Sequence, residues 1–134
     1  MSNMFYKEAC ANIICSDFPD LDVIRVDDVY YMVSTTMHFM PGCVILRSYN
    51  LKDWEFCSYV YDELEKTEKQ TLADNHGIYG KGMWAASLRY DNGTFYVAFV
   101  ANDTHKTYLY RSESIEGPWK KTEIQGFFHD LSLL

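Results

Sequence analysis

The sequence is 134 residues long, which is enough for one domain of ordinary size, and its 48% of hydrophobic residues exclude a compositionally disordered chain. Aromatic residues make up 16% of the chain and prefer strands, so the composition favours an all-β protein. The net charge is −7 and no cluster of lysine and arginine is present, which argues against nucleic acid as a partner and leaves neutral ligands such as carbohydrates.

The first residues of the chain carry no targeting signal that we recognise. Residues 1–17 lack the basic region and following apolar stretch of a secretory signal. No stretch approaches the roughly 18 apolar residues of a membrane span. We therefore expect a cytoplasmic protein whose cysteines are reduced thiols, and their spacing is not that of a zinc site. These cysteines are Cys10, Cys15, Cys43 and Cys57.

An internal repeat begins with two matching hairpins. The first covers residues 23–33 around an acidic turn, and the second covers residues 87–97 around the turn Asp91-Asn92-Gly93. An Asn-Gly pair between alternating apolar runs is a strong short-range signal of a β-hairpin. The likeness continues from residues 44–54 to residues 108–119. Each unit therefore reads as a set of short antiparallel strands.

The repeat also aligns large side chains at a fixed offset. Arg25 and Arg89 are 64 residues apart, and Trp54 and Trp119 are 65 apart. Four short strands per unit, recurring at this scale, indicate propeller blades, although an immunoglobulin-like sandwich is an alternative. Repetition favours a structural role for the two arginines, such as pairing with a turn carboxylate. The period is long for a blade, and we expect residues 61–82 to be a solvated polar insertion.

A third unit begins at the end of the sequence, where residues 130–134 align with residues 20–24. The chain is therefore expected to hold about two blades plus the first strand of a third. Propellers typically need four to eight blades to close. We interpret residues 1–134 as the N-terminal part of a single β-propeller domain.

One position, just before each inner strand, carries residues suited to chemistry. The repeat places Asp20, Trp84 and Asp130 there in three successive units. Because the innermost strands of a propeller line a central channel, we expect these side chains to converge on one mouth of it. Two carboxylates beside an indole suit a sugar, and carboxylates about 6.5–9.5 Å apart serve inverting glycoside hydrolysis. The alternative is that both aspartates are ordinary turn residues.

Several segments, taken in order, resemble a known family. Residues 12–26 and 30–38 resemble the opening of glycoside hydrolase family 43. Later segments look like that family's landmarks in the right order, namely residues 46–48, 52–54, 84–90 and 129–134. The resemblance implies an all-β, five-bladed β-propeller. It also implies a β-xylosidase, α-L-arabinofuranosidase or endo-arabinanase that works with inversion.

The resemblance assigns a role to each aspartate. Asp20 matches the general base, and Asp130 matches the residue that tunes the pKa of the general acid and helps to orient substrate. Leu21 and Leu131 stand where the family commonly has proline; leucine can adopt the same backbone but places the carboxylate less rigidly. The general acid, a glutamate of a later blade, would lie beyond Leu134. We therefore expect hydrolysis of O-glycosidic bonds in xylo- or arabino-oligosaccharides, with the general acid missing from this chain.

Two further residues are candidates for binding substrate. Trp84 would form an apolar wall of the sugar pocket, with a purely structural indole as the alternative. His38 follows the aromatic strand of the first unit, where it could bind a substrate hydroxyl or, alternatively, the backbone. His129 is expected only to orient Asp130. We expect no cofactor and no metal, because the sequence has no dedicated Ca²⁺ loop.

Two other functions stay open at this point. The chain could be a truncated, catalytically inactive carbohydrate-binding fragment, which would bind an oligosaccharide through Trp84 without cleaving it. It could also be a scaffold, because a truncated propeller exposes sheet edges that can pair with other chains. The expected partner is an oligosaccharide, with no nucleic acid and no membrane, and with self-association through exposed sheet edges.

Overall fold

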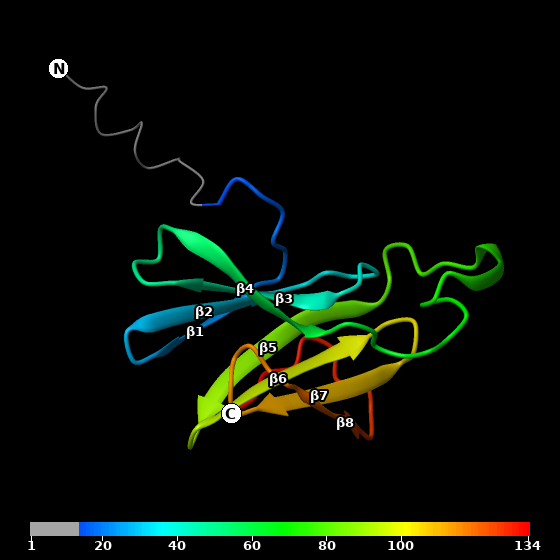
Figure 1. The fold of residues 1–134 in the computed structure, drawn as a ribbon. Coiled ribbons are helices and arrows are strands. Elements are labelled where there is room, and N and C mark those ends of the chain that lie inside the picture. The colour runs from blue at the N-terminus through cyan, green and yellow to red at the C-terminus, as the bar shows by residue number, and fades with distance from the viewer. Residues whose placement is uncertain (1–13) are drawn as a thin grey trace.

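The computed structural model describes residues 14–134, which form two four-stranded antiparallel sheets (Figure 1). Sheet 1 contains β1 (Asp22–Val26), β2 (Val29–Ser34), β3 (Gly42–Ser48) and β4 (Trp54–Tyr61). Sheet 2 contains β5 (Met83–Asp91), β6 (Thr94–Ala101), β7 (Lys106–Ser112) and β8 (Lys120–Ile124). In both sheets the strands are hydrogen-bonded in chain order. The predicted all-β class and the repeat of four strands are confirmed.

The two predicted hairpins form with two-residue turns. Val26 pairs with Val29 in sheet 1, and Asp91 pairs with Thr94 in sheet 2. Asn92 and Gly93 both have positive φ, at 46° and 82°, as the favoured hairpin turn requires. Equivalent positions in the two hairpins are therefore 65 residues apart.

This register corrects the predicted equivalence of the two arginines. Arg25 pairs with Tyr30, one pair away from the turn, whereas Arg89 pairs with Tyr96, two pairs away. Because successive residues of a strand point to opposite faces, the two arginines lie on different faces of their sheets. The sequence alignment was one residue out of register here.

The main core lies between the two sheets and is rich in aromatic rings. Phe99 of β6 is fully buried, and its ring centroid lies 5.7 Å from that of Tyr61 at the end of β4. Tyr110 of β7 stacks on Phe99, also at 5.7 Å. Aliphatic side chains of both sheets, such as Ile45 and Val97, are buried in the same cluster. The two sheets therefore share one hydrophobic core.

Residues 62–82 connect the sheets, and the prediction that they form a solvated insertion is wrong in part. Leu64 and Ile78 are buried. A carboxylate oxygen of Glu65 accepts hydrogen bonds from Lys106 Nζ at 2.9 Å and from the Tyr108 hydroxyl at 2.7 Å. Burial opposes ionisation of Glu65, but these hydrogen bonds outweigh it and hold its pKa below the usual value. The connection is thus fastened to sheet 2 and contains a short 3₁₀ helix, η1 (Ala73–Asn75).

The predicted first strand of a third unit is not formed as a strand. Residues 131–134 have no regular secondary structure, because they pair with no neighbouring strand within the described part of the chain. Hydrogen bonds to β5 hold the segment instead: Arg89 Nε donates to the Leu133 carbonyl at 2.7 Å, and Leu133 N donates to Ser87 Oγ at 3.2 Å. No helix within residues 14–134 is long and apolar enough to cross a membrane.

Candidate active site

The end of β2 fixes the backbone in front of Asp20. The carbonyl oxygen of Pro19 accepts hydrogen bonds from Ser34 Oγ at 2.6 Å and from Thr35 N at 3.1 Å. The hydroxyl of Thr35 in turn accepts a hydrogen bond from the backbone N–H of Ala85 at 2.9 Å. The first residues of the two inner strands, β1 and β5, are therefore held beside one another.

The two candidate aspartates share an uncommon backbone conformation. Asp20 and Asp130 have φ of 50° and 51°, and Ala85 has φ of 34°. Eleven non-glycine residues within residues 14–134 have positive φ, so the shared conformation supports the equivalence of the two aspartates but does not by itself mark a functional site. This conformation differs from the extended one that a following proline would impose, so the leucines that replace proline permit it.

Asp20 and Asp130 line the same cavity, although they are 110 residues apart in the sequence. The cavity has a volume of about 340 Å³. Both aspartates are exposed. The other lining residues are Leu21, Asp22, Ala85, Ala86, Ser87, Arg89, Leu131 and Ser132. The structure therefore brings together the two carboxylates that the repeat singled out.

Arg89 joins the backbone segments that carry the two aspartates. Its Nη1 donates to Asp22 Oδ2 at 2.8 Å, and its Nη2 donates to Ser132 Oγ at 2.9 Å. Its Nε donates to the carbonyl oxygen of Leu133 at 2.7 Å. Asp22 and Ser132 each lie two residues after one of the aspartates. Sequence reasoning missed this bridge, because no local pattern links partners more than 40 residues apart.

Trp84 lies beside His129, the residue before Asp130, but it does not line the cavity of the two aspartates and is not their repeat counterpart. Its ring meets the edge of the His129 ring at a centroid distance of 5.8 Å, and His129 Nδ1 is 3.3 Å from Asp130 Oδ2. The residue with positive φ in the second unit is Ala85, one position later. The predicted equivalence of Trp84 is therefore wrong, since the offset between the hairpins is 65 residues and not 64.

His38 lies apart from the cavity of the two aspartates and is not among its lining residues. Its Nδ1 accepts a hydrogen bond from the backbone N–H of Gly80 at 3.2 Å. Its ring lies beside Phe39 and Tyr79. His38 is therefore bonded to the backbone, which was one of the two alternatives predicted from the sequence. It lies in the loop that follows β2.

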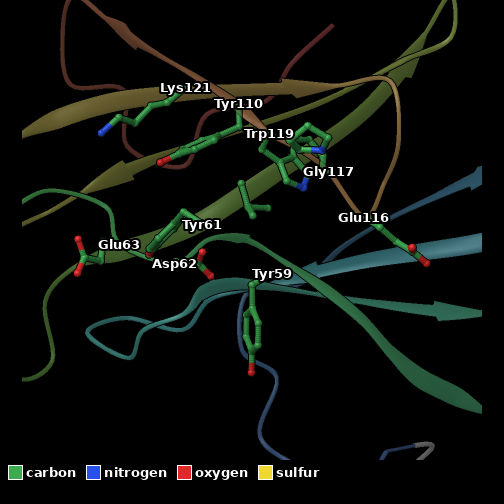
Figure 2. Close-up of a pocket in the computed structure, with 11 residues that line it drawn as sticks. Tyr59, Tyr61, Asp62, Glu63, Tyr110, Glu116, Gly117, Trp119 and Lys121 are labelled. Atoms are coloured by element: carbon green, nitrogen blue, oxygen red, sulfur yellow. The ribbon is translucent and has the colours of Figure 1, made fainter.

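A larger groove lies elsewhere, at the outer edge between the two sheets (Figure 2). It has a volume of about 510 Å³ and shares no lining residue with the cavity of the aspartates. Two of its aromatic rings, Tyr61 and Tyr110, belong to the buried core. Its acidic residues are Asp62, Glu63 and Glu116. Glu116 forms an ion pair with Arg47 at 3.3 Å. Size alone therefore does not select this groove as the active site.

The described residues offer no other reactive centre of the kinds considered from the sequence. Within residues 14–134, no group of three or more His, Cys, Asp or Glu side chains is placed to hold a metal ion. Cys15, Cys43 and Cys57 form no disulfide with one another, and Cys10 lies outside the described residues. Burial raises the pKa of the Cys43 thiol far above its usual range, which makes it an inert core residue.

Comparison with known proteins decides the family. The sequence profile described as Glycosyl hydrolases family 43 matches residues 11–126. The chain belongs to this family. A β-xylosidase of Formosa agariphila is 33% identical to this family 43 chain over 109 residues, and a non-reducing end α-L-arabinofuranosidase of Bacteroides ovatus is 29% identical over 110 residues. These matches cover 81% and 80% of the chain.

Solved structures of family 43 proteins agree with the fold. A bifunctional GH43-CE protein of Bacteroides eggerthii matches 90% of this chain with a TM-score of 0.86 and 44% sequence identity. A GH43 glycoside hydrolase with an engineered active site matches 85% of the chain with a TM-score of 0.76 and 30% identity. The chain covers only 17% and 24% of those two structures, and 18% and 20% of the two curated relatives. This family 43 chain thus spans about a fifth of the length of its curated relatives.

Proposed function

We propose that the protein containing this chain hydrolyses O-glycosidic bonds in xylo- or arabino-oligosaccharides with inversion at the anomeric carbon. One observation carries the proposal: Asp20 and Asp130, chosen from the sequence as a pair, line one cavity in the folded chain. Membership of family 43 supports the reaction class. The names of the relatives, a β-xylosidase and an α-L-arabinofuranosidase, support pentosides as the substrates.

The proposed mechanism gives the two carboxylates different tasks. Asp20 acts as general base and takes a proton from the water that attacks the anomeric carbon. Asp130 is the pKa modulator: its negative charge disfavours ionisation of the general acid and so keeps that acid protonated until it protonates the leaving oxygen. The general acid is a glutamate contributed from outside these 134 residues. Exposure of both aspartates leaves them accessible to water and sugar.

The proposed fold of the whole domain is a five-bladed β-propeller. Sheets 1 and 2 would be its first two blades, and the segment after Asp130 would lead into the third. The side-by-side starts of β1 and β5 support this arrangement, because inner strands of neighbouring blades converge at the channel. Residues 1–134 would then be the N-terminal part of that single domain.

Trp84 and His38 are proposed to contact the substrate. Trp84 lies beside His129, whose Nδ1 is 3.3 Å from Asp130 Oδ2, so its indole would form an apolar wall one residue away from the second carboxylate. The two outer neighbours of His38, Phe39 and Tyr79, are exposed rings, so a sugar bound near His38 would meet aromatic surface. Both contacts stay predictions.

The test of the proposed function uses the whole protein and aryl β-xylosides and aryl α-L-arabinofuranosides. Unsubstituted protein should release pentose, and Asp20→Ala should lower kcat by about 100-fold or more, the contribution expected of a general base. Asp28→Ala is the matched control, since Asp28 is an exposed turn aspartate whose side chain is 97% accessible. Undiminished release by Asp20→Ala would remove Asp20 from the mechanism. Binding of oligosaccharide without cleavage by the unsubstituted protein would favour the inactive carbohydrate-binding alternative.

The cytoplasmic location and the self-association of the isolated chain also stay predictions. In the described residues, β4 and β8 are outer strands that each pair with one strand only, so their other edges lack a strand partner. Open edges can pair with other chains. Light scattering of the 134-residue chain at several concentrations should show a mass that rises with concentration. A constant monomer mass would contradict the prediction.

A further inference from the structure

Three aromatic rings form a continuous cluster on the surface. The ring of His38 lies between its neighbours, with centroid distances of 4.3 Å to Phe39 and 5.0 Å to Tyr79. The two outer residues are strongly exposed, Phe39 at 67% and Tyr79 at 89%. Single exposed apolar side chains are ordinary, but a contiguous group of rings marks a surface that binds something.

Backbone contacts hold this aromatic cluster in place from two separate segments. Gly80 N donates to His38 Nδ1, which joins the end of the connection between the sheets to the loop after β2. Beside it, Met83 N donates to the Met37 carbonyl at 3.1 Å, where β5 begins. A ring surface that is already fixed loses little conformational freedom when a ligand binds, which favours affinity.

A groove runs from one ring of the aromatic cluster to the residue in front of Asp20. The groove has a volume of about 500 Å³, and Phe39 lines it together with Pro19, the residue that precedes Asp20. Met37 and Phe18 are further apolar residues that line it. Phe39 therefore borders the same depression as the segment that carries the proposed base, and Tyr79 lies next to Phe39's neighbour His38.

The residues of the groove restrict the chemistry of its ligand. Asp17 is the one charged residue among those that line the groove, and it is acidic, so a polyanion would find no counter-charge there. The hydroxyl of Tyr59 lies at the same surface for polar contacts. Flat aromatic faces with a hydroxyl and no cation suit the C–H faces and hydroxyls of a neutral sugar chain.

We propose that the Phe39–His38–Tyr79 cluster is a distal subsite, which binds sugar units of a neutral pentose oligosaccharide beyond the unit held at Asp20 and Asp130. The identity of the ligand rests on the proposed function. Tyr79 comes from the connection between the sheets, so this segment contributes to substrate selection in addition to joining the two sheets. The subsite makes the protein prefer oligosaccharides over aryl glycosides of a single pentose.

The experiment measures binding separately from turnover. Whole protein carrying Asp20→Asn is titrated calorimetrically with xylotetraose and arabinotetraose, and with xylose and arabinose. Tyr79→Ala and Phe39→Ala on this background should each raise the Kd of the preferred tetrasaccharide about 3- to 10-fold, the effect of losing one aromatic contact. The Kd of the monosaccharide should not change. Tyr79→Phe, which keeps the ring, should bind like the parent.

Tyr49→Ala is the matched control, because Tyr49 is also an exposed tyrosine, at 64%, but lies just past the far end of β3. It should leave the Kd unchanged. Equal Kd values for tetrasaccharide in parent, Tyr79→Ala and Phe39→Ala would overturn the subsite, as would a parent that binds tetrasaccharide no more tightly than monosaccharide. Hydrolysis by unsubstituted protein is scored separately: ring-dependent binding without any hydrolysis keeps the subsite and refutes the proposed function.

Discussion

Sheets 1 and 2 follow one plan of four antiparallel strands, yet the residue that opens the inner strand differs between them. Asp20, just before β1, and Ala85, near the start of β5, both have positive φ and lie 65 residues apart, the offset set by the two hairpins. The same left-handed backbone thus carries a carboxylate in one unit and a methyl group in the next. The repeated backbone sets the geometry, and the side chain alone determines whether the position can do chemistry.

A second difference concerns the arginines of the two hairpins. Arg25 in sheet 1 bonds to its own turn through Asp28, an exposed local pair at 3.2 Å. Arg89 in sheet 2 reaches Asp22 of β1 and residues of the final segment. The first arginine therefore acts within one hairpin, whereas the second ties three segments around the candidate site.

The largest expected effect tests whether the two sheets fold as one unit. Phe99→Ala should lower the free energy of unfolding by about 3–5 kcal/mol, because the ring is fully buried against Tyr61 and Tyr110 from both sheets. Phe56→Ala, at an exposed position on β4, should change it by less than about 0.5 kcal/mol. Urea unfolding monitored by fluorescence measures both. Equal losses, or two separate transitions for the two sheets, would contradict a shared core.

A smaller effect separates the two arginines. Arg89→Met should cost about 1–2 kcal/mol of unfolding free energy, since it removes hydrogen bonds to Asp22, Ser132 and the Leu133 carbonyl. Arg25→Met should have almost no effect, because its ion pair is exposed to water. Denaturant titration of the two variants side by side is the measurement. If Arg25→Met proved the more damaging change, the bridging role of Arg89 would be wrong.

The smallest effect is a pH dependence at the connection between the sheets. The pKa of Glu65 is lowered in the folded protein from its ordinary 4.5, because hydrogen bonds from Lys106 and Tyr108 outweigh burial. The ionised form therefore adds stability above about pH 4.5, and this stability is lost as the pH falls through the lowered pKa. The advantage of unsubstituted protein over Glu65→Gln in Tm should shrink on acidification towards pH 3. A constant difference between pH 7 and pH 3 would show that Glu65 is not held as a partnered carboxylate.

Much of the fold could be predicted from the sequence because its signals are local. Alternating apolar residues and the Asn92-Gly93 turn predict the hairpins, and the recurrence of tryptophan and arginine predicts two similar units. The register of the inner strands could not be predicted as easily. The alignment matched Arg25 with Arg89, an offset of 64 residues, whereas the paired residues of the two hairpins are 65 residues apart. Trp84 was therefore aligned with the aspartates in place of Ala85.

The candidate site shows the same limit. Asp20 and Asp130 were found because repetition marks equivalent positions, and the fold brings both to one cavity. Long-range hydrogen bonds gave no such signal. Glu65 was expected to be solvated because its sequence neighbours are polar, yet its partners Lys106 and Tyr108 lie more than 40 residues away. Residues whose roles depend on distant partners had to be read from the structure.

The central claim is that Asp20 and Asp130 act in one site, and a double-mutant cycle on the whole protein tests it most directly. The values of kcat/KM for an aryl pentoside are compared among unsubstituted protein, Asp20→Asn, Asp130→Asn and the double variant. We predict that each single change lowers kcat/KM about 100-fold or more. The double variant should lose much less than the two losses multiplied together, because the effects of groups that act as a unit are not additive. Losses that multiply independently, or full activity in either single variant, would contradict the claim.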